Sequence, residues 1–215
     1  MQERYGRQFR IFTPAAYESF IYSFFSSFFL QAVHSDVFLL SNINDNLQEQ
    51  AFALYSKMII DNADEWLVDI NKIAVCGFSA GGHLAAALGT MGKIRPAAMI
   101  LGYPCITKDI CNDCDVLKNH ENVPVLDDKV DNNTPPAFIF ASSDDGLVPI
   151  RSSIKFAEAL GENKIPYEMH IFSEGGHGFS TADYVTCDGI YSNSASQWIP
   201  LCKDWLYKLF NKTID

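Results

Sequence analysis

The segment Gly77-Phe78-Ser79-Ala80-Gly81-Gly82-His83 constrains the fold of this chain more than any other stretch. It follows an apolar run at residues 72–76 and precedes an alanine- and leucine-rich run at 84–88, whose composition favours a helix. A G-x-S-x-G sequence between a strand and a helix is typical of a sharp turn that exposes its serine at the strand end. We expect this turn to be too tight for a side chain at position 77 or 81. The alternative interpretation is a glycine-rich turn without any chemistry.

Two later loops carry residues that could complete a catalytic set with this serine. An apolar run at 137–141 is followed by Asp144 and Asp145, and a predicted strand at 168–172 is followed by His177, which has a glycine on each side. Catalytic groups in open parallel sheets gather beyond the carboxyl ends of the strands. The pattern therefore predicts a nucleophilic serine, a histidine base and an orienting aspartate.

The other four histidines lie in positions that do not favour a role as the catalytic base. One follows the serine turn in the first turn of the expected helix, where we predict a structural hydrogen bond. The remaining three lie beside a strand, in a polar irregular segment and within a strand. These four residues are His83, His34, His120 and His170.

Five motifs in order make the chain resemble the α/β-hydrolase superfamily. Within it, the chain is similar to the acetyl-esterase and xylan-esterase-like enzymes related to the prolyl oligopeptidase group. The resemblance covers about residues 37 to 210, and its motifs lie at 77–85, 101–104, 134–138, 144–149 and 170–178.

This resemblance implies a serine carboxylesterase that acts on small acyl esters such as acetyl esters, including those of carbohydrates. It implies Ser79, Asp144 and His177 as the catalytic residues, with Asp145 as the alternative acid if the alignment slips by one position. The backbone N–H of Ala80 would bind the oxyanion. The mechanism would need neither a cofactor nor a metal ion.

The chain departs from the family pattern near its N-terminus. Related enzymes carry a glycine-rich loop that supplies part of the oxyanion hole, whereas this chain has Ala15 and Ala16 in the equivalent segment at 12–18. Alanine resists the backbone conformations that glycine allows. The departure leaves open a second function, that of a catalytically weak or inactive binding protein with a hydrolase fold. A peptidase is a third, less favoured interpretation.

The order of expected elements favours a single α/β domain over residues 1–215. Strands expected at 9–12, 37–40, 73–76, 97–101, 137–141 and 168–172 alternate with segments of helical spacing. Such alternation predicts a mostly parallel sheet with helices on both faces. The early strands of the full hydrolase sheet are expected to be missing or rearranged. The polar segment 105–133 is interpreted as either a lid over the substrate or a solvated surface loop.

The net charge limits the classes of partner that we expect for this chain. The net charge of −10 argues against nucleic acid, because phosphate binding needs Lys and Arg. We expect a small-molecule ester as the partner and no association with a membrane. The aromatic run at 20–30 is too short and too rich in serine to span a bilayer, and a buried helix is favoured over a signal peptide.

The six cysteines show no disulfide framework by their spacing. Cys111 and Cys114 form a C-x-x-C without a second pair, so we expect no zinc site. Reduced thiols and a cytoplasmic location are the expectation.

Overall fold

Four parallel strands form the centre of the fold. A computed structural model describes residues 57–66, 68–106, 124–183, 192 and 194–211. The strands are β1 (Ala74–Phe78), β2 (Ala98–Gly102), β3 (Ala137–Ser142) and β4 (Tyr167–Phe172). They pair in the order β1-β2-β3-β4, and every pairing is parallel.

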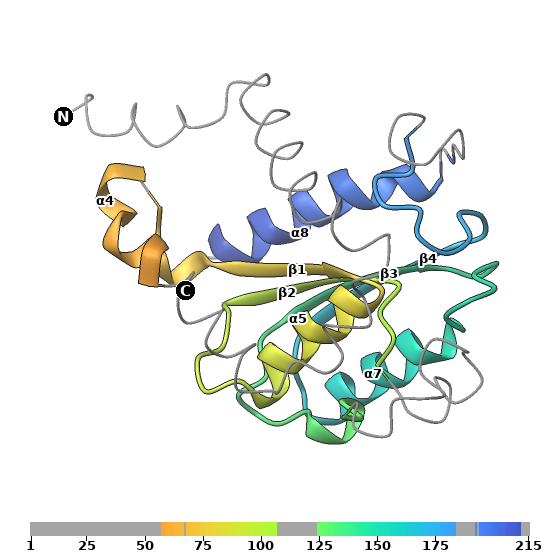
Figure 1. Cartoon of the computed structure of the whole chain (residues 1–215), viewed down its shortest axis with the longest axis horizontal. Coiled ribbons are helices and arrows are strands. Elements are labelled where there is room, and N and C mark those ends of the chain that lie inside the picture. The colour runs from red at the N-terminus through yellow and green to blue at the C-terminus, as the bar shows by residue number, and fades with distance from the viewer. Residues whose placement is uncertain (1–56, 67, 107–123, 184–191, 193, 212–215) are drawn as a thin grey trace, which may run out of the picture.

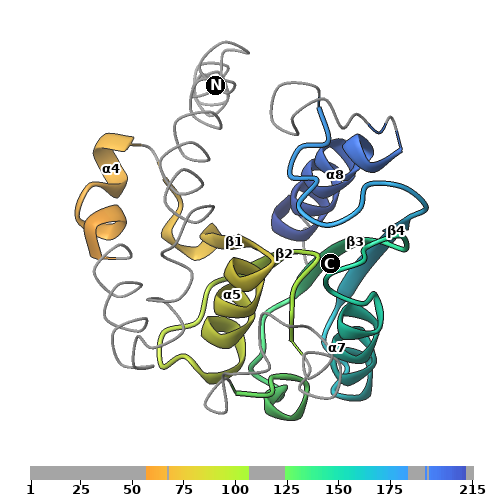
Figure 2. The same cartoon turned by 45° about the vertical axis from the view of Figure 1, so that its right-hand side comes forward.

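Three longer helices cover the two faces of this sheet. Helices α5 (Ala80–Met91) and α7 (Arg151–Glu162) lie on one face, and α8 (Trp198–Asn211) lies on the other (Figures 1 and 2). The short helix α4 (Ala63–Trp66) precedes β1. Three 3₁₀ turns complete the described elements: η1 (Ile70–Lys72), η2 (Asp127–Lys129) and η3 (Ala195–Gln197).

Alternating side chains on the central strands build two separate cores. In β2, Met99 and Leu101 pack with α5 and α7, whereas Ile100 packs with α8. In β3, Ile139 joins the first core and Phe138 joins the second. A strand that is apolar on both faces reads as a continuous hydrophobic run, which is typical of a parallel sheet covered by helices on both sides.

The expected α/β-hydrolase fold is confirmed in the described part of the chain. The strands expected at 73–76, 97–101, 137–141 and 168–172 correspond to β1 to β4, with ends that differ by at most two residues. The strands expected at 9–12 and 37–40, the helix expected at 20–30 and the Cys111–Cys114 motif lie outside the described residues.

The segment expected as a lid or surface loop is anchored at both of its described ends. Ile106 and Leu126 are fully buried in the core beneath α7. The Ser152 hydroxyl in α7 donates to Pro104 O (3.0 Å) and accepts from Ile106 N–H (2.8 Å). Residues 107–123 lie outside the described part, so the choice between lid and surface loop stays a prediction.

The expectation of reduced thiols is wrong at one position. Cys105, which lies just beyond the end of β2, is disulfide-bonded. Cys76 and Cys202 are free thiols, as expected. The interpretation failed because spacing along the chain does not show which cysteines the fold brings together.

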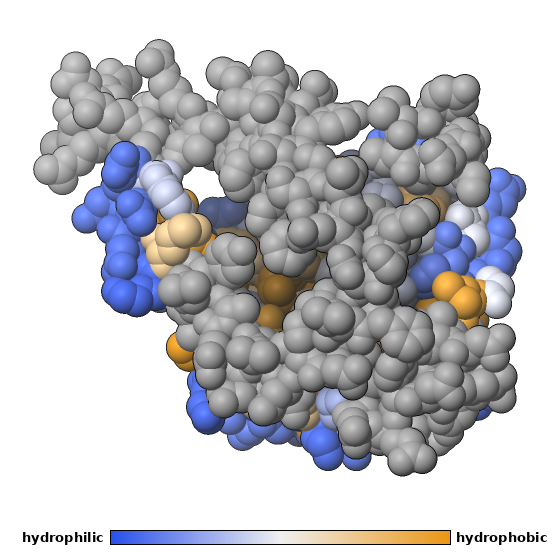
Figure 3. All heavy atoms as spheres, in the orientation of Figure 1, coloured by the Kyte–Doolittle hydropathy of each residue, from blue (hydrophilic) through white to orange (hydrophobic). Residues whose placement is uncertain are grey.

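The surface around α4 carries hydrophilic side chains (Figure 3), and within this helix Asp64 and Glu65 are exposed together with Trp66, which is 42% exposed. Among the described residues, no helix has both the length and the apolar character needed to cross a membrane.

Candidate active site

Ser79 lies on a strained turn between β1 and α5. Its backbone has φ 53° and ψ −119°, in a region that residues other than glycine rarely adopt. The Ser79 N–H donates to Gly102 O at the end of β2 (2.9 Å), which fixes the turn to the neighbouring strand. The turn therefore presents the serine side chain beyond the carboxyl edge of the sheet.

The glycines of the turn differ from the expectation at one position. A Cβ atom at Gly77 would lie 2.0 Å from Gly81 O, so this position requires glycine. A Cβ at Gly81 would meet no atom within 4 Å, so the predicted clash at position 81 is wrong. The crowded position is the next one, because a Cβ at Gly82 would lie 2.8 Å from Pro104 Cβ.

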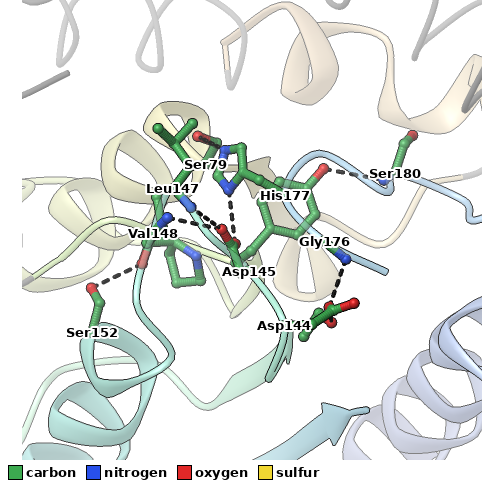
Figure 4. Close-up of polar contacts among 12 residues, drawn as sticks. Ser79, Asp144, Asp145, Leu147, Val148, Ser152, Gly176, His177 and Ser180 are labelled. Carbon is green, nitrogen blue, oxygen red and sulfur yellow. Dashed lines mark hydrogen bonds and ion pairs between the residues drawn. The ribbon is translucent and has the colours of Figure 1, made fainter. Parts of the chain in front are cut away.

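Three side chains from three loops form one hydrogen-bonded chain (Figure 4). Ser79 Oγ lies 2.8 Å from His177 Nε2, although the two residues are 98 positions apart in the sequence. His177 Nδ1 lies 2.8 Å from Asp145 Oδ2. Ser79 follows β1, Asp145 follows β3 and His177 follows β4, so the topology of the sheet brings the three together.

The Asp145 carboxylate is enclosed and fully supplied with donors. Its side chain is 1% exposed, and that of His177 is 18% exposed. The other carboxylate oxygen, Oδ1, accepts from the N–H groups of Leu147 (2.9 Å) and Val148 (2.8 Å). His177 Nδ1 lies against the second oxygen, Oδ2, so both carboxylate oxygens have partners.

The structure does not place Asp144 against the imidazole, which corrects the prediction for the acid. A turn follows β3, with the Asp145 N–H donating to Ser142 O (3.4 Å). This turn directs the Asp145 side chain toward His177 and the exposed Asp144 carboxylate toward the Gly176 N–H. The alternative register considered from the sequence is the one that the geometry supports.

The residues predicted for the oxyanion hole are only partly described. Ala80 is the first residue of α5, where backbone N–H groups have no partner within the helix. Ala80 directly follows Ser79, and its role as a donor to an oxyanion stays a prediction. Ala15 and Ala16 lie outside the described residues.

Two other histidines have structural partners. His83 Nδ1 lies 2.8 Å from Cys105 O, and its side chain is buried, so the predicted structural hydrogen bond is present. His170 Nε2 lies 2.8 Å from Glu168 Oε1 within β4. His34 and His120 are outside the described residues.

Tyr103 is a site residue to which the sequence analysis gave no role. It follows β2 with φ 35°, is 1% exposed, and packs its ring edge-on against His177 with 5.1 Å between ring centroids. It belongs to one of the motifs that carry the resemblance, at 101–104. The sequence signal was therefore present, but a buried tyrosine beside proline reads as core packing.

One carboxyl beside the site and two thiols outside it have shifted pKa values. The pKa of Asp144 is lowered, first by the Ser142 hydroxyl and then by the Gly176 N–H. Burial raises the pKa of the Cys202 thiol to about 12 and that of Cys76 still further, so neither thiol is a nucleophile near neutral pH. No group of three or more candidate metal ligands occurs among the described residues.

Comparison with protein families identifies the wider group. The model of the dienelactone hydrolase family matches residues 36–206 of this chain. The chain belongs to the dienelactone hydrolase family. This family of hydrolases falls within the α/β-hydrolase superfamily, in agreement with the parallel sheet and the serine turn.

Two curated relatives are similar over part of their length. Endo-1,4-beta-xylanase B of Butyrivibrio fibrisolvens is 32% identical over 149 residues, which cover 59% of this chain and 24% of the relative. The acetylxylan esterase of Xylanibacter ruminicola is 30% identical over 147 residues, which cover 61% of this chain and 30% of the relative. The chain thus spans about a quarter to a third of the length of these relatives.

Two solved structures share the fold. The α/β hydrolase MGS-M1 from a Medee basin deep-sea metagenome library is 36% identical with a TM-score of 0.65, over 73% of this chain and 62% of that one. The carboxylesterase Cest-2923 from Lactobacillus plantarum WCFS1 is 25% identical with a TM-score of 0.68, over 78% of this chain and 69% of that one.

Proposed function

We propose that this protein is a serine carboxylesterase that hydrolyses small acyl esters, with acetyl esters of carbohydrates as the favoured substrates. The observation that supports the reaction type is the hydrogen-bonded chain Ser79–His177–Asp145. The acetylxylan esterase among the relatives supports the acyl group and the carbohydrate, by analogy rather than from the geometry of this site.

The proposed reaction is a two-step acyl transfer. His177 Nε2 takes the proton of the Ser79 hydroxyl as its oxygen attacks the ester carbonyl. Asp145 holds the imidazole in the tautomer with hydrogen on Nδ1 and stabilises the imidazolium that forms. The Ala80 N–H stabilises the negative charge on the carbonyl oxygen. The imidazolium then protonates the leaving alcohol, and water attacks the acyl-enzyme in the reverse sequence of proton transfers.

The strained backbone at Ser79 is consistent with this role. A residue other than glycine in this region costs about 1–3 kcal/mol and persists only where the surrounding structure imposes it. Here the hydrogen bond to Gly102 O and the glycine at 77 impose it. The same backbone path keeps the serine oxygen within reach of His177.

The test is a panel of p-nitrophenyl esters from acetyl to octanoyl, together with a prolyl-amide substrate. We expect the highest kcat/KM for the acetyl ester and no cleavage of the amide. Preference for octanoyl would contradict the proposed small acyl group, and efficient cleavage of the amide would favour a peptidase.

A fluorophosphonate probe tests the nucleophile directly. The wild type should be labelled and Ser79→Ala should not, while both give the same circular dichroism spectrum. Equal labelling of the two proteins would remove Ser79 from the mechanism. Absence of both labelling and ester hydrolysis in the wild type would support a binding protein instead.

A further inference from the structure

The segment that carries His177 has no regular structure of its own. This segment, residues 173–180, is here called the histidine loop, and it runs from the end of β4 without a helix or strand. Its backbone has positive φ at Gly175 (148°), Gly176 (62°) and Gly178 (80°). Because glycine adds conformational freedom, the position of the imidazole must be set by contacts from outside the loop.

One such contact lies just before the histidine. The Gly176 N–H donates to Asp144 Oδ1 over 2.8 Å (Figure 4). The same carboxylate oxygen accepts from the hydroxyl of Ser142, which is fully buried at the end of β3. Asp144 therefore ties the start of the loop to the sheet.

The second contact lies just after the histidine. The Ser180 N–H, which is marked in Figure 4, donates to the Tyr103 hydroxyl over 3.2 Å. The Tyr103 backbone is itself fixed, since its N–H donates to Phe140 O in β3 (2.6 Å). Between these two anchors, the Tyr103 ring packs edge-on against the imidazole.

We propose that Asp144 and Tyr103 are positioning residues that hold the histidine loop on both sides of His177 and so keep Nε2 within reach of Ser79. The inference rests on the proposed function and deepens it. Asp144 touches none of the reacting atoms, and Tyr103 acts through the imidazole. The two neighbouring aspartates thus have different roles, because Asp145 orients the imidazole ring and Asp144 orients the backbone that carries it.

The charged anchor is tested with Asp144→Ala, which removes the acceptor of the Gly176 N–H. We expect kcat on p-nitrophenyl acetate to fall about tenfold, with KM within about twofold, because the loop is displaced but substrate binding is retained. Asp144→Asn keeps an oxygen acceptor and should restore kcat to within about threefold of the wild type. An exposed aspartate elsewhere gives the control: Asp69 also accepts a backbone N–H, from Asn71 (3.0 Å), and Asp69→Ala should leave kcat unchanged.

The buried anchor is tested with Tyr103→Phe, which keeps the ring against His177 and removes the acceptor of the Ser180 N–H. We again expect kcat to fall about tenfold at nearly constant KM. If either variant were poorly folded by circular dichroism, kcat of Asp144→Ser would test the contribution of the Asp144 carboxylate instead, because this position is exposed. The serine side chain at position 144 is too short to accept from the Gly176 N–H and is small enough to leave the surrounding packing unchanged.

A His177→Ala background separates positioning from a general structural role. In that background neither Asp144→Ala nor Tyr103→Phe should lower the residual rate further, because both act through His177. A further loss of the residual rate would overturn the inference.

Wild-type kcat in both single variants, with an active wild type, would also overturn the inference and leave the esterase proposal intact. A wild type that neither hydrolyses the ester nor reacts with the fluorophosphonate would instead overturn the proposed function and this inference with it.

Discussion

At the scale of single residues, the two neighbouring aspartates differ in environment more than in chemistry. Asp145 is enclosed and shared between an imidazole and two backbone N–H groups, whereas Asp144 is exposed. A difference of one position in the turn after β3 decides which of them meets His177. The functional assignment of each aspartate therefore depends on the local backbone path.

The first prediction follows from this difference. Asp145→Asn should lower kcat about 10⁴-fold, because an amide in this place favours the wrong imidazole tautomer. Steady-state kinetics on an acetyl ester measure it, and Asp144→Asn, expected to lose no more than about threefold, is the matched control. A larger loss in the Asp144 variant would return the acid to the position expected from family resemblance.

The sequence singled out Ser79 and His177, which the structure brings together, but left the acid open between two adjacent aspartates. Ser79 and His177 stand in motifs whose glycines restrict the backbone, and each has one candidate position. The aspartate pair offers two adjacent carboxylates, and the direction of each depends on the hydrogen bond from the Asp145 N–H to Ser142 O. Tyr103 was missed for a related reason, because only the fold brings it to His177.

At the scale of elements, the turn between β1 and α5 makes a sharp steric prediction. Gly77→Ala should lower the free energy of unfolding by about 1–3 kcal/mol, since its Cβ would overlap the Gly81 carbonyl. Gly81→Ala should be neutral or stabilising by up to about 1 kcal/mol, because the site is open and alanine favours the helix. Urea unfolding of the two variants measures the contrast, and equal destabilisation would contradict it.

A second element-level prediction concerns the connection between α5 and the segment before β3. Arg95 pairs with Asp131 through two contacts of 2.5 and 2.9 Å, and its Nη2 also donates to Thr90 O in α5. The hydrogen bond from Arg95 lowers the pKa of Asp131 from 3.8 to about 2. This lowered pKa means that the pair stabilises the fold above about pH 4 and stops doing so as the pH falls toward 2.

Asp131→Asn should therefore lower the free energy of unfolding at neutral pH. The variant should also lose less stability than the wild type between about pH 4 and pH 2. Urea unfolding at several pH values measures both effects. Identical acid dependence in the two proteins would show that the pair contributes nothing in solution.

The elements themselves were largely predictable from the sequence. The central strands are apolar on both faces, so β2 and β3 read as continuous hydrophobic runs at their observed positions. Helices α7 and α8 followed from apolar residues at helical spacing. The course of the segment after β2 was not predictable, because its anchors are single buried residues such as Ile106 rather than a periodic pattern.

At the scale of the whole molecule, the site depends on all four strands that the structure describes. The three residues of the hydrogen-bonded chain follow β1, β3 and β4, and β2 lies between the first two of these strands. Separating any pair of neighbouring strands would displace at least one of the three side chains. Activity should therefore report the integrity of the sheet as a whole.

The corresponding prediction is that catalysis and structure are lost together in urea. Trp198 and Trp205 are buried in the core between α8 and the sheet, so their fluorescence follows the packing of that face. The midpoints of ester hydrolysis, tryptophan fluorescence and circular dichroism should coincide, as in a two-state transition. Loss of activity at a clearly lower urea concentration would indicate that the histidine loop detaches before the sheet unfolds.

The distance in sequence between Ser79 and His177 has a consequence for how this protein is made. A nascent chain that ends before residue 177 already contains the serine turn but lacks the histidine that we propose as its base. In the proposed mechanism, Ser79 therefore meets its base only after β4 has been synthesised and paired with β3.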